Sequence, residues 1–270
     1  MRRELSISSR NLHWNNLPIG GYPVENGLYT QSEFQEFHYG TRCMTPDGRV
    51  FKYCGSKTAL LSGFGAANYA ALNIGAVLPA AVSVGSREWI KITIASGDGY
   101  AGDGVIAEDE LVGAYVVMGH GESLVQNRMI IKNSAVASGG GTTYVKLDGA
   151  IEQIMTASSS YCEVLMNPYK YLAKGSLEYN AFMCVPSQNV TSGYSFWGQT
   201  WGPCWITPGG VDASPGDTVN DRTAYFVGDG SVNFGTALTV ETGYQLAGFC
   251  IDTTAIGTSA APFIMLQISV

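Results

Sequence analysis

The carboxylates between residues 98 and 110 form the densest group of side chains in this sequence that could do chemistry. The stretch SGDGYAGDGVIAEDEL holds Asp98, Asp103, Glu108, Asp109 and Glu110. Clustered carboxylates can bind calcium or act as an acid/base pair, but an EF-hand spaces its acids differently, and glycosidases place two carboxylates across a cleft. We therefore expect a solvated turn between strands, with structural calcium as the alternative.

The histidines and serines show no catalytic or metal-binding pattern. His13, His38 and His120 are far apart, and none lies in an HxxxH, HExxH or HxH motif. Ser123 follows His120 closely in GHGES, but the G-x-S-x-G nucleophile elbow is absent there and elsewhere in the chain. Short Gly-x-Gly pieces lack the strand and helix that a nucleotide fingerprint needs. The sequence therefore predicts no cofactor and no enzyme activity.

The cysteines are scattered without a CxxC pair, so neither a zinc site nor a redox motif is indicated. Most of them sit in apolar or aromatic runs, where a free thiol behaves as a small hydrophobic side chain. We expect buried, reduced thiols at Cys43, Cys54, Cys162, Cys184, Cys204 and Cys250.

Three tryptophans recur at a spacing of four in the stretch SFWGQTWGPCW, at Trp197, Trp201 and Trp205. On one continuous strand, the period of two would place all three on one face, as in a sugar-binding platform. The Gly202-Pro203 pair predicts an interruption instead, and hence a hairpin that sends the rings to different places. We expect these rings in the core or at a subunit interface, with a ligand platform as the alternative.

Short apolar runs between Gly, Pro and Asp turns must position these side chains. The segment EWIKITIA alternates isoleucines with other residues, as a half-buried strand does, and Pro46-Asp47-Gly48 supplies a hairpin turn. Only the Ala- and Gly-containing stretch around 66–72 suggests a short helix. Strands are expected at 50–53, 88–95, 113–118, 126–132, 143–146, 161–166, 179–185, 194–199, 224–227, 245–251 and 263–268. Turns at this spacing predict an all-β fold, an antiparallel, jelly-roll-like β-sandwich or barrel with few short helices.

Residues 1–40 are aromatic but show no sustained period, so we expect an extended N-terminal arm. Aromatic side chains without a core of their own pack against something else, either the same domain or a neighbouring subunit. The body would span 41–270, with room for two β subdomains that meet near 75–87. The candidate capsid or subunit interface residues are Trp14, Tyr22, Tyr29, Phe34, Phe37, Trp197 and Trp201.

The composition excludes several classes of partner. Charged residues make up 14% of the 270 residues against 46% hydrophobic ones, with a net charge of -7. Such a chain folds, and it lacks the basic surface with which proteins bind nucleic acids. No apolar run is long enough to span a membrane, and the N-terminus lacks the apolar core of a signal peptide. The sequence predicts a soluble protein made in the cytoplasm.

Several segments resemble head proteins of tailed bacteriophages. The first is YGTRCMTPDGRVFKYC at 39–54, followed by a Gly- and Ala-rich stretch. NPYKYL at 167–172, GYSFWGQTWGP at 193–203, GTAL at 235–238 and FIMLQI at 263–268 are similar too. Cys54 and the Lys57-Thr58 pair depart from the pattern, where Ala and Gly are expected, which leaves the subfamily open.

This resemblance implies a decoration or cement protein on the capsid surface of the virion. Its expected role is to clamp neighbouring subunits of the major capsid protein, typically as a homotrimer, without contacting nucleic acid or membrane. Two alternatives stay open: a carbohydrate- or receptor-binding β module of a tail or fibre, and a tail-tube or connector protein.

Overall fold

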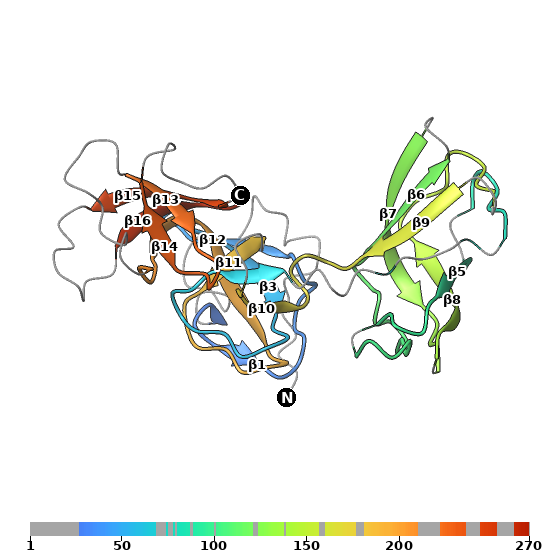
Figure 1. Cartoon of the computed structure of the whole chain (residues 1–270), viewed down its shortest axis with the longest axis horizontal. Helices are drawn as coiled ribbons and strands as arrows, with labels where there is room; N and C mark the ends of the chain where they lie inside the picture. The colour runs from blue at the N-terminus through green and yellow to red at the C-terminus, as the bar shows by residue number, and fades with distance from the viewer. Residues whose placement is uncertain are drawn as a thin grey trace. The chain divides into compact units, whose positions relative to one another are not determined.

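A computed structural model gives an antiparallel, all-β protein and confirms the predicted fold class (Figure 1). Its sheets form a half-barrel and a nearly closed barrel, and the described residues contain no α-helix. The contacts divide the chain into two compact units: unit 1 comprises Met1–Tyr69 and Pro168–Val270, and unit 2 comprises Ala70–Asn167. The structure describes residues 27–68, 74, 78, 80–86, 89–99, 101–120, 124–137, 139–156, 160–176, 181–209, 222–235, 244–252 and 262–269.

Unit 1 contains an 11-stranded sheet whose main path runs β10-β4-β11-β12-β16-β15-β13-β14. Strand β3 pairs along the first half of β12, β2 pairs with β3, and the short β1 also pairs with β12. The strands are β1 (Gln31–Ser32), β2 (Arg42–Met44), β3 (Val50–Gly55), β4 (Ala66–Asn68), β10 (Leu172–Lys174), β11 (Phe182–Pro186), β12 (Ser195–Trp205), β13 (Thr223–Phe226), β14 (Val232–Phe234), β15 (Leu246–Asp252) and β16 (Phe263–Gln267).

Unit 2 contains a five-stranded antiparallel sheet in the order β5-β8-β7-β6-β9. The alternation in β5 is as predicted, because Ile90, Ile92 and Ile94 are all buried. The strands are β5 (Ile90–Ile94), β6 (Tyr115–His120), β7 (Leu124–Asn133), β8 (Gly141–Leu147) and β9 (Ser160–Leu165). All of them fall on segments that the sequence marked as strands.

The chain passes between the units twice, near residue 70 and near residue 168. The sequence suggests one optional boundary near 75–87, and no pattern in it indicates the return near 168. Unit 2 is thus an insertion between β4 and β10 of unit 1. These two strands pair with each other directly, which closes unit 1 on either side of the insertion.

The hairpin predicted around Pro46-Asp47-Gly48 joins β2 to β3. Backbone hydrogen bonds from Thr45 N to Arg49 O (2.9 Å) and from Gly48 N to Thr45 O (2.9 Å) close the turn. Gly48 has φ +85°, a conformation that glycine adopts without steric cost.

Two local predictions were wrong. Residues 66–68 of the expected short helix form β4, because this segment pairs with β10 on one side and β11 on the other. The Gly202-Pro203 pair does not end β12, which runs through it and pairs with β16 as far as Trp205. The missing N–H of Pro203 is tolerated because β3 stops pairing with β12 at Trp201.

A buried side-chain amide holds this irregular part of β12 together. Gln199 Nε2 donates to the carbonyl oxygens of Trp201 (3.1 Å), Gly202 (3.3 Å) and Pro203 (2.8 Å). The register against β3 shifts between Gln199 and Trp201, which marks a β-bulge, and Gly202 has φ +94°. The amide thus replaces the strand hydrogen bonds that the bulge removes.

Three packed clusters form the core among the described residues of unit 1. One lies beneath the sheet from β11 to β14, a second surrounds Cys54 and Cys184, and the third is aromatic. Their buried members are, in this order, Ala67, Phe182, Val185, Cys204, Ile206, Ala224, Phe226, Val232, Phe234, Ala247, Cys250, Ile264 and Leu266; Cys54, Leu60, Ala66, Leu172, Cys184, Val190 and Phe196; and Leu28, Cys43, Phe51, Tyr53 and Trp197.

All six cysteines are buried free thiols, as predicted from their apolar surroundings. The sulfurs of Cys54 and Cys184 approach to 3.7 Å without a disulfide. Burial raises the pKa of Cys162 and Cys204 from 9.0 to about 12. Burial also raises the pKa of Cys184 well above 9.0. These thiols therefore stay protonated, and unreactive as nucleophiles, at neutral pH.

The raised thiol pKa values predict a loss of stability in alkali. Between pH 9 and 12 the unfolded thiols release protons that the folded thiols keep, so the free energy of unfolding falls as pH rises. The full stability is present below pH 9, and Cys162 and Cys204 each remove about 1.4 kcal/mol per pH unit above it. Urea unfolding of the wild type and of Cys162→Ala, at about pH 8 and about pH 10, measures this. The variant should lose less stability between the two conditions, and an equal loss contradicts the prediction.

Candidate functional site

The acidic stretch of unit 2 shapes turns. Asp98 Oδ2 accepts from Ala95 N (2.7 Å), Asp103 Oδ1 from Val105 N (3.0 Å) and Glu110 Oε2 from Ala107 N (2.7 Å). Asp109 has φ +60°, and its Oδ1 accepts from the backbone N–H of Asn133 (3.3 Å). Within the described ranges, no three His, Cys, Asp or Glu side chains gather as metal ligands. These carboxylates therefore act as acceptors for their own backbone.

The histidines are not brought together at a described site. His38 is exposed in the loop before β2. His13 and the side chain of His120 lie outside the described residues.

The candidate interface residues of the arm fall into three groups. Trp14 and Tyr22 lie outside the described residues. Phe34 is 74% exposed, and Tyr29 is 49% exposed with its hydroxyl oxygen accepting from Arg49 Nη1 at 3.0 Å. Contact of these residues with a partner stays a prediction. Phe37, the fifth, is partly buried within unit 1.

Phe37 and Trp197 belong to an aromatic cluster inside unit 1. The Phe37 ring lies 5.2 Å from that of Tyr53 and 5.3 Å from that of Trp197, while Tyr53 and Trp197 meet edge to face at 5.2 Å. Trp197 is only 4% exposed. Its ring therefore offers almost no area to a partner, and its role in this fold is to fix the segment before β2 against β3 and β12.

Replacing Trp197 by alanine should destabilise unit 1 by about 3–5 kcal/mol, because it empties an aromatic site in the core. Urea unfolding followed by circular dichroism measures the loss. Phe34→Ala is the matched control, since Phe34 is 74% exposed, and it should change stability by less than about 0.5 kcal/mol. A Trp197→Ala loss as small as that of the control contradicts the assigned core role.

The bulge in β12 separates the three tryptophans. Before the bulge Trp197 faces the core beside Tyr53, its partner on β3. All residues of β12 before Trp201 are buried, and alternation begins only after the bulge, where Trp201 is partly exposed and Trp205 is 52% exposed. The three rings thus do not form one platform, and Trp205 is the one most available to a ligand or partner.

An apolar surface covers the side of β12, β16 and β15 that faces away from the core. The alternation is strict in β16, where Ile264 and Leu266 are buried and Phe263 is 42% exposed. Trp205 pairs across from Phe263, and Phe249 pairs across from Met265. We call this surface the outer face; its most exposed members are Trp205 (52%), Phe263 (42%), Phe249 (45%), Ile251 (42%) and Leu246 (45%).

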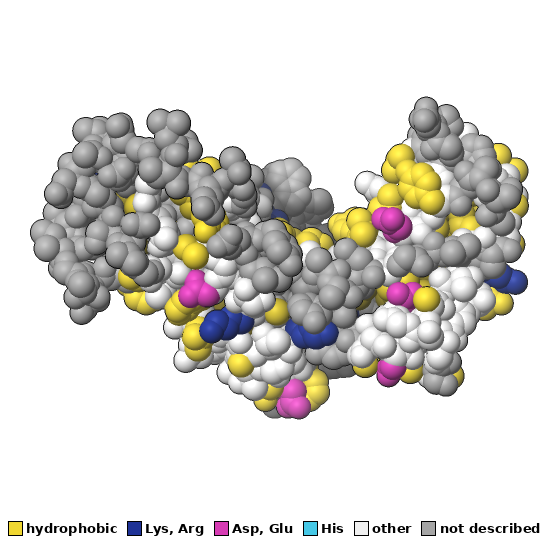
Figure 2. Space-filling model, in the orientation of Figure 1, with side chains coloured by type: hydrophobic (Ala, Val, Ile, Leu, Met, Phe, Trp, Pro, Cys, Tyr) yellow, Lys and Arg dark blue, Asp and Glu magenta, His cyan; other side chains and the backbone are white. Residues whose placement is uncertain are grey.

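Unit 2 carries a second apolar surface, which is mixed with charged side chains. Tyr115 is 40% exposed, Tyr161 46% and Val125 56%, and these residues lie on adjacent strands β6, β9 and β7. Figure 2 shows apolar side chains at the surface of unit 2 with single acidic side chains among them. On β9, Glu163 pairs with Val117 and is exposed. A partner that covered this surface would therefore have to bury or pair that charge.

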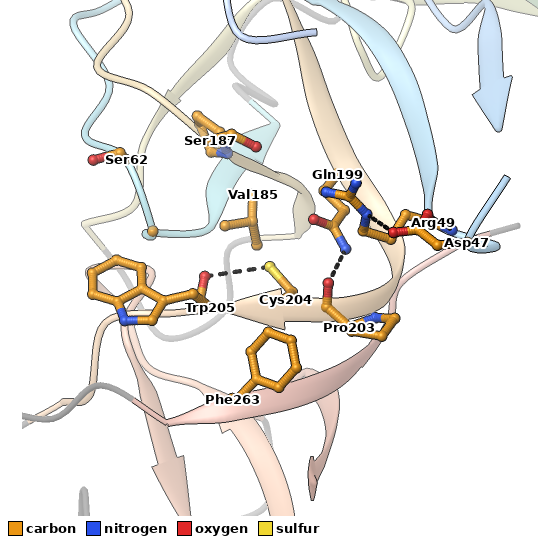
Figure 3. Close-up of a pocket in the computed structure, with 12 residues that line it drawn as sticks. Asp47, Arg49, Ser62, Val185, Ser187, Gln199, Pro203, Cys204, Trp205 and Phe263 are labelled. Carbon is orange, nitrogen blue, oxygen red and sulfur yellow. Dashed lines mark hydrogen bonds and ion pairs between the residues drawn. The ribbon is translucent and has the colours of Figure 1, made fainter. Parts of the chain in front are cut away.

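A groove of about 500 Å³ lies beside the outer face, between the β2–β3 turn and the end of β12 (Figure 3). Asp47 and Arg49 lie at one side of this groove in the view and Trp205 at the other. The remaining side chains that line it are Ser62, Val185, Pro186, Ser187, Gln199, Pro203, Cys204 and Phe263, together with Gly63.

The polar end of the groove is an ion pair. Arg49 Nε donates to Asp47 Oδ2 at 2.7 Å, and the Thr45 hydroxyl donates to Asp47 Oδ1. Burial raises the pKa of Asp47, but the hydrogen bonds from Thr45 and Arg49 outweigh it and hold that pKa below 3.8. The Asp47 side chain is still 56% exposed. Asp47 is thus an ionised acceptor at the rim of the groove.

The apolar end of the groove is the indole of Trp205, which rests on Gly63. A Cβ at Gly63 would lie 2.1 Å from Trp205 Cζ3, and Gly63 has φ +74°, so glycine is required on both grounds. The ring is thus supported from one side while half of its surface stays exposed.

The described part of the chain contains no helix of the length and apolarity that crossing a membrane requires. Comparisons with family models, with curated proteins and with solved structures find no match to this chain, so its function has to be inferred from the fold and from these surfaces.

Proposed function

We propose that this chain is a structural protein of a tailed-phage virion that decorates the capsid and clamps neighbouring subunits of the major capsid protein. In this role the chain acts by binding and carries out no reaction. We further propose that it works as a homotrimer, the symmetry that suits a position on a three-fold axis of a shell.

The outer face is the observation that carries this proposal. Large apolar side chains are exposed on adjacent strands. The opposite side of the same strands is already packed against a buried hydrophobic cluster. Contiguous exposed apolar surface with aromatic residues is typical of protein interfaces, where burial supplies most of the binding free energy. The identity of the partner rests on the resemblance of residues 39–54 and 193–203 to phage head proteins.

The proposal is tested on the full chain and on empty, expanded shells of the encoding phage that lack it. The expected results are a native mass of three protomers by light scattering and saturable binding of the chain to the shells on sedimentation. A ring larger than a trimer would favour a tail or connector protein. A chain that does not sediment with the shells contradicts the decoration role.

A further inference from the structure

We propose that the groove between Asp47, Arg49 and Trp205 binds a neutral saccharide. This inference goes beyond the capsid role, which needs no ligand site, and it stands on residues that the outer face does not share except at Trp205 and Phe263. The site differs from the platform considered from the sequence, because only one of the three tryptophans takes part.

The groove has the size of a small-molecule site. Its volume of about 500 Å³ lies within the range of roughly 300–1,000 Å³ that is usual for ligand pockets. Its residues come from the β2–β3 turn, the loop before β4, the end of β11, and strands β12 and β16. Most of these positions lie on or next to paired strands, so the groove keeps its shape without a ligand.

Trp205 supplies the surface on which a pyranose ring can stack. The face of an indole carries negative charge density, which attracts the polarised C–H groups on one side of a sugar ring. Trp205 is 52% exposed, and contact with Gly63 limits the positions of its ring. A ring held in this way loses little conformational freedom on binding. The small entropic cost lets even a ligand with few contacts bind measurably.

Asp47 and Arg49 supply the polar groups that sugar hydroxyls need. An ionised carboxylate accepts hydrogen bonds only, whereas a guanidinium carries five donor hydrogens. Two donor groups of Arg49 are engaged within the protein, Nε with Asp47 at 2.7 Å and Nη1 with the Tyr29 hydroxyl at 3.0 Å. This pair thus offers acceptors and donors side by side, as a vicinal diol requires.

The charge of this pair favours a neutral ligand over an anionic one. Arg49 is compensated by Asp47 at 2.7 Å, and Asp47 is the more exposed of the two, 56% against 25%. A phosphate or a uronic acid would meet the Asp47 carboxylate at the rim and be repelled. The apolar residues Val185, Cys204 and Phe263 add no charge, so the ligand class is a neutral sugar.

The test is calorimetric titration of the full chain with glucose, galactose, mannose, N-acetylglucosamine and their common disaccharides. At least one of them should bind with a dissociation constant of about 1 mM. Trp205→Ala should weaken this binding at least about tenfold, and Asp47→Asn to a similar degree. Trp89→Ala is the matched control, since Trp89 is 49% exposed and belongs to unit 2, and it should leave binding unchanged.

Two further measurements make the outcome decisive. Glucuronate, the anionic counterpart of glucose, should bind more weakly than glucose, and the reverse order overturns the assignment of a neutral ligand. Phe249→Asp changes the outer face but not the groove, so it should retain sugar binding even if the capsid proposal fails. The proposal is overturned if no sugar binds at roughly 50 mM, or if Trp205→Ala binds as tightly as the wild type while remaining folded.

Discussion

Phe249→Asp is expected to abolish tight binding to capsid shells while leaving the protein folded. Phe249 is 45% exposed on the outer face, with Met265 opposite it on β16. A carboxylate at this position would be buried without a partner in the complex, and its dehydration opposes binding. The loss should equal that of an interface hot spot, about 2–4 kcal/mol or roughly 30- to 1,000-fold in dissociation constant. Sedimentation of the variant with empty shells measures it.

Leu61→Asp is the matched control for this substitution. Leu61 is 44% exposed in the same unit but lies outside the outer face. The same charge placed there should change shell binding by less than about threefold. If both variants bind as the wild type does, the outer face is not the contact surface. If both variants lose shell binding equally, the loss comes from the added negative charge and not from a particular contact surface.

Gly248→Ala is expected to give the largest loss of stability of any single methyl addition in unit 1. Gly248 lies in β15 at the irregularity opposite β13, with φ +145°. A Cβ there would lie 1.9 Å from the carbonyl oxygen of Met265 and 3.3 Å from Leu266 Cα, both backbone atoms of the adjacent strand. The strand pair has to separate locally, at a cost of about 3 kcal/mol or more.

Urea unfolding of Gly248→Ala and of Gly27→Ala separates this clash from the general effect of adding a methyl group. Nothing lies within 4 Å of a Cβ at Gly27. The control should change stability by less than about 1 kcal/mol. A Gly248→Ala protein as stable as the control would show that β15 and β16 are not packed as described.

The strands could be predicted because their signal is local. In β5 three isoleucines alternate with other residues, and this pattern alone identifies both the strand and its buried face. The turn at Pro46-Asp47-Gly48 is equally local, since each residue type suits its position in the turn. These features need no knowledge of the rest of the chain.

The path of β12 could not be predicted because a side-chain amide contact and the pairing with a strand far along the sequence decide it. Gly202 and Pro203 disfavour a strand by themselves. The amide of Gln199 and the pairing with β16 outweigh this preference. The helix prediction failed at residues 66–68 for a similar reason, because pairing of Ala66–Asn68 with β10 and β11 overrides local helix propensity.

The outer face and the groove were beyond the reach of sequence patterns. The segment 245–251 was predicted as a strand, but alternation cannot say that apolar residues on its second side stay uncovered. The groove joins residues far apart in the chain, such as Asp47, Ser187 and Trp205, and only the fold brings them together. Of the candidate interface residues, Trp197 was chosen for its aromatic character, which suits a core equally well.

The copy number of this chain in purified virions tests the central claim most directly. A decoration protein that occupies the three-fold positions of a shell must be present in a fixed and large proportion to the major capsid protein. Quantitative mass spectrometry of virions, with the major capsid protein as the internal reference, should give such a proportion, and removal of the chain should make the shells less stable to heat. Absence of the chain from the virion, or a number that fits only a single ring, would contradict the proposed decoration role.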